Sequence, residues 1–532
     1  MKEKIRKLPA DSPPFSEIIN EDRVYVDKTA YLAGLIDNDS KTLFFTRPRR
    51  FGKTLIVSTL EALLSGQKEL FKGLAVEKRL GEKAFAPRPV IHLDMRDIDT
   101  SSGVSGLRSS LRNMTAEIAE TLKVSVPDNL FPSEILGKII KQCAEKSPDV
   151  LPAVLVDEYD SPYLDFRHKP EELAEVIEVL RNYYVQLKIK RKHLSFVFVT
   201  GITKSALTDF YSTFNNYTDI SINPKYGALT GFTHEEIKAN FAPHIQEAAS
   251  SLKVTEGKLL DKLQDYYDGF CFDGQTYLYN PFSALQFFEN KEFLNFWFST
   301  GTSNFLAKYM KDKGLTPEDF RGLPFTKSAA LNLVGLDSND PTNFLHQAGY
   351  LSLRPGLDSD FTLDYPNREV RESMSLLVMR NFLQLKTNDS IKRLLEALRL
   401  RKPTGVIEEF NLLLANIPYE DYEGVKKNAE GFYRSCLFAF LYSAGLDPRA
   451  EHHGKFGRTD ISLKYKDVPW VMEIKICTGK KDEVTANLAL DQILATKCGD
   501  SFKDPVLVGI AINDSLRTIK IWKSLGESRN PE

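Results

Sequence analysis

Short apolar runs alternate with long amphipathic segments over the first 230 residues. Runs typical of buried strands lie at 41–45, 89–95, 153–160 and 194–202. Segments of helical period separate them, such as PEELAEVIEVLRNYYVQLKI at 170–189. Strands that alternate with helices are typical of a mainly parallel sheet covered on both faces. The pattern therefore predicts an α/β domain over residues 1–230.

The pattern changes twice after that point. From GFTHEEI at 231–237, short amphipathic segments and aromatic-rich turns predict a mainly helical second domain over 231–385, of a lid or winged-helix type. The polar stretch at 383–390 is the predicted linker. The third domain, 386–532, is predicted as α/β. It begins with three helical patterns and continues with strands near 459–465, 470–476, 505–512 and 518–524 and a helix near 484–497.

Composition narrows the class of protein without identifying a ligand. At 532 residues the chain is long enough for two or three domains, and 42% hydrophobic with 27% charged residues is ordinary for a folded protein. The formal net charge of −2 provides no overall field that would attract nucleic acid or acidic lipid. Five scattered cysteines without a CxxC pair indicate neither a disulfide framework nor a zinc site. With no apolar stretch long enough to span a bilayer, we expect a cytoplasmic protein.

The stretch RPRRFGKT at 47–54 has the context of a phosphate-binding loop. It follows a predicted strand and precedes a predicted helix, so backbone N–H groups and the helix dipole would face a phosphate. Gly52 would let the backbone approach closely, Lys53 would reach the β and γ phosphates, and the Thr54 hydroxyl would bind Mg²⁺. Arg47 stands where the usual loop has its first glycine, and GKT alone can also be an ordinary helix start.

A second motif favours nucleotide binding. The apolar run AVLVDEYD at 153–160 ends in adjacent carboxylates, which suits Asp157 for Mg²⁺ and Glu158 for orienting or activating a water. A strand that merely ends at solvent would also show this pattern, but the two motifs together, on separate strands in the right order, predict ATP and Mg²⁺ binding. Thr200, at the end of a further strand, either senses the γ phosphate or caps a turn.

The loop arginines leave two interpretations open. Arg47, Arg49 and Arg50 would supply charge to the transition state or read a partner's phosphate, or else they are solvated loop charges. Pro48 fixes one φ angle, so we expect a stiff loop. We assign to the nucleotide site the residues Arg49, Arg50, Phe51, Gly52, Lys53, Thr54 and Asp157.

A second candidate site lies in GRTDISLKYKDVPWVMEIK at 457–475. Two strand patterns joined by KDVP predict a hairpin, and alternation along a strand places Glu473 and Lys475 on one side. Asp460 begins the neighbouring strand and can approach them. Two carboxylates suit Mg²⁺, and the lysine can orient a water or stabilise developing charge. Alternating Glu and Lys is also common on exposed strands, but the run around Glu473 is mostly apolar.

These motifs together resemble bacterial proteins that join an AAA-ATPase-like domain to a C-terminal PD-(D/E)XK nuclease superfamily domain. The stretches that carry the first resemblance are YVDKT, RPRRFGKT, LVDEYDSPY, TGITK, LTGFTHEEI, YDGFCF and YNPFS. Those that carry the second are EGFYRS, GRTDISL, MEIK and ALDQI. The resemblance implies a P-loop ATPase domain with a parallel sheet, a helical middle and a restriction-endonuclease-like C-terminal domain.

The resemblance also implies roles for individual residues. Lys53 and Thr54 would bind phosphate and Mg²⁺, and Asp157 with Glu158 would serve the metal and the hydrolytic water. Asp460, Glu473 and Lys475 would be the nuclease residues, with Asp460 and Glu473 as metal ligands. The supporting candidates are Glu430, Glu451, Arg458 and Gln492.

Two functions are compatible with these motifs. In the first, the nucleotide state of the ATPase domain regulates a Mg²⁺-dependent nuclease that acts on nucleic acid, for which we expect DNA rather than RNA. In the second, the chain is a signalling ATPase of switch type that forms nucleotide-dependent homo-oligomers, and its C-terminal domain only binds nucleic acid or a protein. From residue 451 onward, thirteen Lys and Arg face twelve Asp and Glu, so no basic stripe favours the first function.

Overall fold

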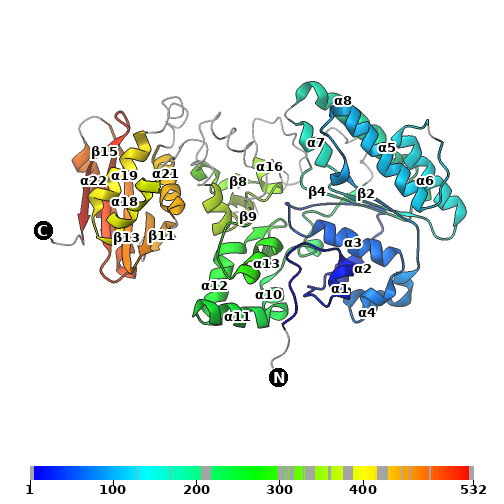
Figure 1. Ribbon diagram of the computed structural model, residues 1–532, viewed down its shortest axis with the longest axis horizontal. Helices are drawn as coiled ribbons and strands as arrows, with labels where there is room; N and C mark the ends of the chain where they lie inside the picture. The colour runs from blue at the N-terminus through cyan, green and yellow to red at the C-terminus, as the bar shows by residue number, and fades with distance from the viewer. Residues whose placement is uncertain are drawn as a thin grey trace. The chain divides into compact units, whose positions relative to one another are not determined.

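The chain folds into two compact units in the computed structural model (Figure 1). The N-terminal unit comprises residues 1–297 and 322–369, and the C-terminal unit comprises 298–321 and 370–532. The structure describes residues 5–127, 129–167, 169–204, 217–297, 306, 310, 317–326, 329, 342–356, 361–374, 388–415, 429–444, 446, 448–454, 457–478 and 481–525. Within these residues, no helix has the length and apolar character needed to cross a membrane.

A five-stranded parallel sheet forms the centre of the N-terminal unit. Its strands are β1 (Thr42–Thr46), β2 (Val90–Asp94), β3 (Ala153–Asp157), β4 (Phe196–Gly201) and β5 (Thr218–Asp219). They lie in the order β2-β3-β4-β1-β5, and each neighbouring pair is parallel. The four strands predicted from apolar runs are confirmed. The two-residue β5 is too short to show any periodicity in the sequence.

Helices cover both faces of this sheet, as expected for parallel strands whose side chains are apolar on both sides. Figure 1 shows α5 (Gly103–Thr121), α6 (Pro132–Lys146) and α8 (Pro170–Ile189) on one side of the sheet. The helices on the other side are α1 (Phe15–Asn20), α2 (Thr29–Ile36), α3 (Lys53–Leu64) and α4 (Ala75–Leu80). The short α7 (Ser161–Phe166) follows β3.

The strand order brings three strand ends to one edge of the sheet. Strand β4 lies between β1 and β3, although it follows both in the sequence. Because the strands are parallel, the carboxyl ends of β1, β3 and β4 lie side by side. Open α/β sheets bind ligands at such an edge, where the strand order departs from the chain order.

The rest of the N-terminal unit is mainly helical, as predicted, and carries two small sheets. Its helices are α10 (His234–Asn240), α11 (Ala242–Leu252), α12 (Glu256–Tyr267), α13 (Pro281–Asn290) and α16 (Thr342–Gln347). One sheet pairs β6 (Phe270–Cys271) with β7 (Tyr277–Leu278), and the other has the order β8-β10-β9. The strands of the latter are β8 (Leu323–Phe325), β9 (Ser352–Pro355) and β10 (Phe361–Asp364). Strands of two to four residues are too short for a sequence pattern to reveal.

The motif YVDKT ties the segment before α2 to α10. Lys28 is buried, and its ammonium contacts both carboxylate oxygens of Glu236 at 2.7 and 2.6 Å. Glu236 also accepts from the backbone N–H of Thr233, whose hydroxyl caps α10 in return. Lys28 of this motif therefore stabilises the fold through its ion pair with Glu236.

Seven short 3₁₀ helices complete the described elements. They are Lys68–Phe71, Gly81–Phe85, Met95–Asp97, Arg191–His193, Pro224–Tyr226, Pro317–Phe320 and Cys498–Ser501.

Among its described residues, the C-terminal unit has three helices followed by a five-stranded mixed sheet. The helices are α18 (Asn388–Arg399), α19 (Pro403–Ala415) and α21 (Ala429–Ser443). The strands, in spatial and chain order, are β11 (Arg449–Gly454), β12 (Gly457–Tyr465), β13 (Val468–Cys477), β14 (Val506–Asn513) and β15 (Thr518–Leu525). The predicted hairpin is confirmed, since β12 and β13 pair antiparallel around the turn at Lys466 and Asp467. Strand β11 was not predicted.

Helix α22 (Asp482–Thr496) connects β13 to β14, which pair in parallel. Successive strand residues point to opposite faces, and the contacts of β13 follow this rule. Trp470 donates its indole N–H to the carbonyl of Leu398 in α18 at 3.2 Å, whereas Val471 packs against Ile493 in α22. The two faces of this sheet are therefore covered by different helices.

The domain boundaries predicted near residues 230 and 385 stay predictions, because the division into two compact units does not decide them. Of the linker predicted at 383–390, residues 383–387 lie outside the described part of the chain, and residues 388–390 begin α18.

Arg47, directly after β1, is buried with 1% of its surface exposed. Its Nη1 donates to the carbonyl oxygens of Thr46 at 2.9 Å and Ser221 at 2.7 Å, and its Nη2 donates to that of Gly227 at 3.3 Å. Burial lowers the pKa of Arg47 to about 10, so the side chain keeps its charge at neutral pH.

Two aromatic rings complete this environment. The guanidinium carbon of Arg47 lies 4.5 Å from the ring centroid of Phe45 and 4.5 Å from that of Phe272. Cation–π contacts of this kind gain strength where water is excluded. Both interpretations of Arg47 from the sequence are wrong: it is neither a solvated loop charge nor available to a phosphate, because it joins β1 to the segment after β5 and to the motif YDGFCF.

We predict that Arg47→Met destabilises the protein by about 3 kcal/mol, because three buried carbonyl oxygens lose a charged donor. Arg49→Met is the matched control at an exposed position of the same loop and should change stability by less than about 0.5 kcal/mol. Urea unfolding of the full chain measures both. Equal stability of the two variants would contradict a structural role for Arg47.

Candidate functional site

The turn between β1 and α3 has the conformation of an anion-binding loop. Gly52 adopts φ 88° and ψ 18°, in the left-handed region that glycine enters without strain, and α3 begins at Lys53. No atom of the described residues lies within 4 Å of where a Cβ would stand on Gly52. Glycine is therefore required here by conformation, and the space next to it is open. The first turn of α3 has no side-chain cap, so its N–H groups are available to an anion.

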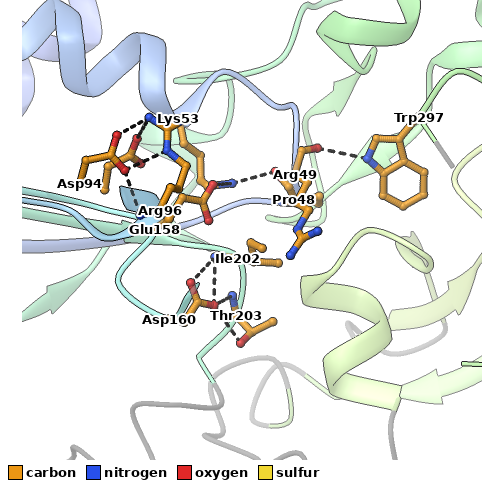
Figure 2. Close-up of polar contacts among 11 residues, drawn as sticks. Pro48, Arg49, Lys53, Asp94, Arg96, Glu158, Asp160, Ile202, Thr203 and Trp297 are labelled. Atoms are coloured by element: carbon orange, nitrogen blue, oxygen red, sulfur yellow. Dashed lines mark hydrogen bonds and ion pairs between the residues drawn. The ribbon is translucent and has the colours of Figure 1, made fainter. Parts of the chain in front are cut away.

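Lys53 occupies the mouth of this loop. Only 3% of the residue is exposed. Its ammonium donates to the carbonyl oxygen of Pro48 at 3.0 Å and forms an ion pair with Glu158 Oε1 at 3.0 Å. The side chain thus bridges the loop and the end of β3 (Figure 2).

Asp157, the last residue of β3, is a buried carboxylate without hydrogen bonds. It is 0% exposed, and neither oxygen has a hydrogen-bond partner among the described residues. Arg96 Nη2 lies 3.8 Å from Oδ2. Burial and the neighbouring Glu158 raise the pKa of Asp157, while Thr54 and Lys53 lower it. The Thr54 hydroxyl is thus close enough to lower this pKa as a weak donor, although its geometry falls short of a full hydrogen bond.

This arrangement suits a bound Mg²⁺. A buried carboxylate is costly unless a cation or donors compensate it, and Mg²⁺ prefers carboxylate, hydroxyl and phosphate oxygens. Asp157 and Thr54 would contribute the protein ligands. Glu158 has a φ of 49°, an uncommon conformation for a non-glycine residue, and it directs its carboxylate to Lys53.

The end of β2 adds a charge pair that we did not predict. Asp94 lies in register with Asp157, and the Arg96 Nε donates to Asp94 Oδ1 at 2.9 Å. A second contact joins Arg96 Nη2 to Asp94 Oδ2. These bonds raise the pKa of Arg96 and keep it charged beside Asp157. The available signal was the sequence DMRD, which follows a predicted strand just as DEYD does.

Asp160 fixes the segment that follows β4. Its carboxylate accepts from the backbone N–H of Ile202 at 3.1 Å and from that of Thr203 at 2.8 Å (Figure 2). Burial and the nearby Glu158 raise the pKa of Asp160 to about 6. The motif DEYD therefore combines residues suited to chemistry with one that positions the neighbouring strand end.

Tyr159 and Gly201 strengthen the same junction. The Tyr159 hydroxyl donates to the carbonyl of Thr203 at 2.8 Å, and a Cβ on Gly201 would lie 2.5 Å from Asp160 Oδ1. Thr200, beside them, is buried, and its hydroxyl has no hydrogen-bond partner among the described residues. An unpaired hydroxyl at this edge fits the γ-phosphate interpretation better than the capping one, and that role stays a prediction.

The other residues assigned to the loop have separate environments. The Arg49 side chain is exposed, and its carbonyl accepts from the Trp297 indole N–H at 3.1 Å. The Arg50 guanidinium carbon lies 3.8 Å from the ring centroid of Phe282. Phe51 is fully buried against Phe270 and Phe272, and its carbonyl accepts from the backbone N–H of Gly231 at 3.3 Å, so its side chain packs in the core and does not face a nucleotide.

In the C-terminal unit, Asp460 and Glu473 meet across the β12–β13 hairpin. Both are buried. Glu473 Oε2 accepts from the backbone N–H of Asp460 at 3.0 Å, and Asp460 Oδ2 accepts from that of Ile474 at 2.8 Å. The structure therefore brings together the two carboxylates that the sequence singled out.

Cations from two elements surround this acidic pair. Lys475 Nζ lies 3.3 Å from Glu473 Oε1 and 3.7 Å from Glu430 Oε1 on α21. Arg434, one helical turn after Glu430, forms an ion pair with Asp460 Oδ1 at 2.8 Å. We did not single out Arg434, although its i+4 spacing from Glu430 places both on one helix face.

The nearby cations do not fully compensate Glu473, as its pKa shows. Burial and the neighbouring Asp460 raise the pKa of Glu473 to about 7, and burial also raises the pKa of Glu430. No group of three or more His, Cys, Asp or Glu residues within the described part of the chain is arranged to hold a metal. Asp460 and Glu473 could still hold Mg²⁺, which commonly keeps several waters and takes one or two carboxylates plus phosphate oxygens.

The remaining candidates are less closely placed. Arg458 is exposed in β12, and Gln492 is half-buried on α22. Glu451 lies in β11, and its side chain is outside the described part.

Comparisons with known proteins match both units. Residues 12–211 match the AAA-ATPase-like family, described as Predicted AAA-ATPase, and residues 428–522 match the PD-(D/E)XK nuclease superfamily. A relative from Azotobacter chroococcum mcd 1, "Uncharacterized protein in vnfD 5'region", is 29% identical over 541 residues, which cover 98% of this chain and 99% of the relative. The similarity thus extends over both units.

One solved structure, "Structure of Drosophila ORC bound to AT-rich DNA and Cdc6", matches 67% of this chain and 91% of its own at 11% identity. Its TM-score of 0.18 is too low to support an argument about fold or function.

We predict that, without metal, the free energy of unfolding of Glu473→Gln increasingly exceeds that of wild type as pH rises. The pKa of Glu473 is about 7 in the folded chain, above its ordinary value of 4.5, so the stability that protonation of this carboxyl contributes is fully present below pH 4.5 and is lost as pH rises through 7. Relative to wild type, the variant should gain roughly 3 to 4 kcal/mol between pH 4.5 and pH 8, since the two pKa values differ by about 2.5 and one pKa unit corresponds to about 1.4 kcal/mol.

Urea unfolding in EDTA at several pH values measures this gain, with the exposed Glu483→Gln as control. Added Mg²⁺ should stabilise wild type but not Glu473→Gln at pH 8. A stability difference that is the same at pH 5 and pH 8 would contradict the buried, uncompensated carboxylate.

Proposed function

Because the chain joins an AAA-ATPase-like domain to a PD-(D/E)XK nuclease superfamily domain, we propose that it hydrolyses ATP and that its nucleotide state regulates a Mg²⁺-dependent nuclease. The observation that carries the proposal is that each unit places an acidic pair beside a buried or half-buried lysine. These sets are Asp157, Glu158 and Lys53 in one unit, and Asp460, Glu473 and Lys475 in the other.

In the first site, the loop and α3 would bind the phosphates of ATP. The N–H groups at the start of α3 face the open space beside Gly52. Lys53 would exchange its contacts with Pro48 O and Glu158 for contacts with the β and γ phosphates. Mg²⁺ held by Thr54 and Asp157 would offset the charge of the phosphates and of Asp157 itself.

Release from Lys53 would leave Glu158 free to act as a base. It would accept a proton from a water as the water oxygen bonds to the γ phosphorus and the bond to the bridging oxygen of ADP breaks. Thr200 and Arg96 would stabilise the charge near this edge. In the absence of nucleotide, the ion pair with Lys53 would keep Glu158 from acting as a base.

In the second site, Asp460 and Glu473 would hold Mg²⁺ against a nucleic-acid phosphate. The metal supplies charge to a phosphate oxygen and makes a bound water more acidic. Lys475 would orient the attacking water or stabilise the charge that develops as a new P–O bond forms and the ester P–O bond breaks. Without a metal, Arg434 balances the charge of Asp460. Once Mg²⁺ takes over that carboxylate, Arg434 would be available to the substrate phosphate.

The charge composition gives only weak support for binding of any nucleic acid, because the region after residue 450 is nearly neutral. We propose DNA as the substrate, in a soluble setting inside the cell. The alternative, a switch-type signalling ATPase whose C-terminal domain only binds a partner, gains support from the stable Lys53–Glu158 pair, which would slow hydrolysis.

We expect Lys53→Ala to weaken ATP binding by about 10- to 100-fold, because charged hydrogen bonds contribute about 1.5 to 3 kcal/mol. Glu158→Gln should retain binding and lower kcat by at least about 100-fold, as removal of a general base does. Calorimetry and phosphate release measure the two effects. Lys72→Ala, at an exposed lysine of the same unit, is the control; if Lys53→Ala behaves like it, Lys53 does not bind phosphate.

Cleavage of DNA should depend on the second site. We expect Glu473→Ala and Lys475→Ala each to lower the cleavage rate at least about 100-fold with Mg²⁺. Lys464→Ala and Asp467→Ala remove an exposed ion pair from the same hairpin and should have no effect. Gel assays with DNA and RNA, in ATP, ADP or no nucleotide, measure the rates.

The same assays separate the two functions. Cleavage by wild type that changes with nucleotide supports the regulated nuclease. No cleavage of any substrate, together with assembly that differs between ATP and ADP and is lost in Lys53→Ala, supports the switch instead.

A further inference from the structure

Trp297, almost 250 positions along the chain from the phosphate loop, forms a hydrogen bond with this loop. Trp297 is buried and donates its indole N–H to the carbonyl oxygen of Arg49 at 3.1 Å (Figure 2). Pro48 packs against Gly349, where an added Cβ would lie 2.6 Å from Pro48 Cγ. The rings of Phe270 and Tyr350 pack on the indole at 6.0 and 5.4 Å. All of these residues belong to the N-terminal unit.

Lys53 and Trp297 hold successive carbonyl groups of one turn. Lys53 binds Pro48 O, and Trp297 binds Arg49 O, the next carbonyl along the chain. Buried carbonyl groups need partners. If nucleotide withdraws Lys53, the carbonyl of Pro48 loses its hydrogen bond while the carbonyl of Arg49 keeps the bond from Trp297. The Pro48–Arg49 peptide could then rotate, and this rotation would move the Arg49 carbonyl that Trp297 binds.

Trp297 also stands where the chain leaves the N-terminal unit. The chain passes to the C-terminal unit after residue 297 and again after residue 369. The backbone N–H of Trp297 donates to Glu369 Oε1 at 2.7 Å, and Glu369 is fully buried. One residue thus bonds to the phosphate loop through its side chain and to the second departure point through its backbone.

We propose that Trp297 is a positioning residue that transmits the nucleotide state of the phosphate loop to the two chain segments leading into the nuclease unit. This inference rests on the proposed ATP binding and names the route of the proposed regulation. The route runs from Lys53 through the Pro48–Arg49 turn to Trp297, and from there to Glu369.

A purely structural tryptophan would show the same packing, so the test needs a variant that keeps the packing. Trp297→Phe retains an aromatic ring but removes the N–H donor to Arg49. Trp522→Phe, at a half-buried tryptophan in β15, is the matched control. Glu369→Met removes the acceptor of the second contact, and it replaces Trp297→Phe, with the same expected results, if that variant fails to fold.

Hydrogen–deuterium exchange of the full chain, with and without ATP and Mg²⁺, gives a readout that does not need nuclease activity. In wild type and Trp522→Phe, ATP should change the exchange of peptides covering 291–297 and 365–374. In Trp297→Phe, that change should fall at least about fivefold, while ATP affinity changes less than about fivefold, the effect of one hydrogen bond. The nucleotide dependence of DNA cleavage should fall with it.

Three other results would contradict a role of Trp297 in transmitting the nucleotide state. Exchange that responds to ATP equally in wild type and Trp297→Phe overturns the route and leaves the proposed function intact. The same holds if wild type binds ATP and neither peptide responds. If wild type binds no ATP, the proposed function fails first and the inference with it.

Discussion

The geometry of the candidate nucleotide site depends on the contacts of the buried Lys53 ammonium. Removed from water, this ammonium needs negative charge and acceptors, and it finds them in Glu158 and in the carbonyl of Pro48. This single side chain therefore fixes the loop after β1 relative to the end of β3. It also keeps the candidate base Glu158 paired. A polyphosphate is the type of ligand that can replace both contacts at once, since it offers several charged oxygens at the start of α3.

The two units share one physical constraint, although their folds differ. Each unit buries a carboxylate whose negative charge is not fully balanced by neighbouring groups. These carboxylates are Asp157, at the end of β3, and Glu473, in the β12–β13 hairpin. Such groups cost stability in the free protein. A protein retains them where a bound cation or substrate supplies the missing charge, which is why strongly shifted carboxylates are common at functional sites. Arg96 and Arg434 reduce the cost at each site without removing it.

Much of the fold could be predicted from the sequence because it depends on local periodicity. The apolar runs that became β1 to β4, β12 to β15 and the helices between them are long enough to show their period, and their placement was confirmed. The proximity of Lys53 to Glu158 and of Asp460 to Glu473 also followed, since parallel strand ends share an edge and hairpin partners lie opposite each other. The roles of these residues stay predictions.

The rest depends on contacts between distant parts of the chain. The burial of Arg47 requires Phe272, more than 200 residues away, and a charged residue in a loop gives no sign of it. Trp297 and Arg434 acquire their importance from Arg49 and Asp460, which no local pattern connects to them. The short strands β5 to β10 form because larger elements place them together, so periodicity could not reveal them.

Calorimetric titration of ATP into wild type and Asp157→Asn, each with Mg²⁺ and with EDTA, measures whether Asp157 binds the metal that accompanies the nucleotide. If the buried Asp157 carboxylate is a metal ligand, Mg²⁺ should strengthen ATP binding to wild type at least about tenfold. The same comparison should show little or no enhancement in Asp157→Asn, with metal-free affinity retained or increased. Equal enhancement by Mg²⁺ in both proteins, or no ATP binding to wild type, would contradict the account.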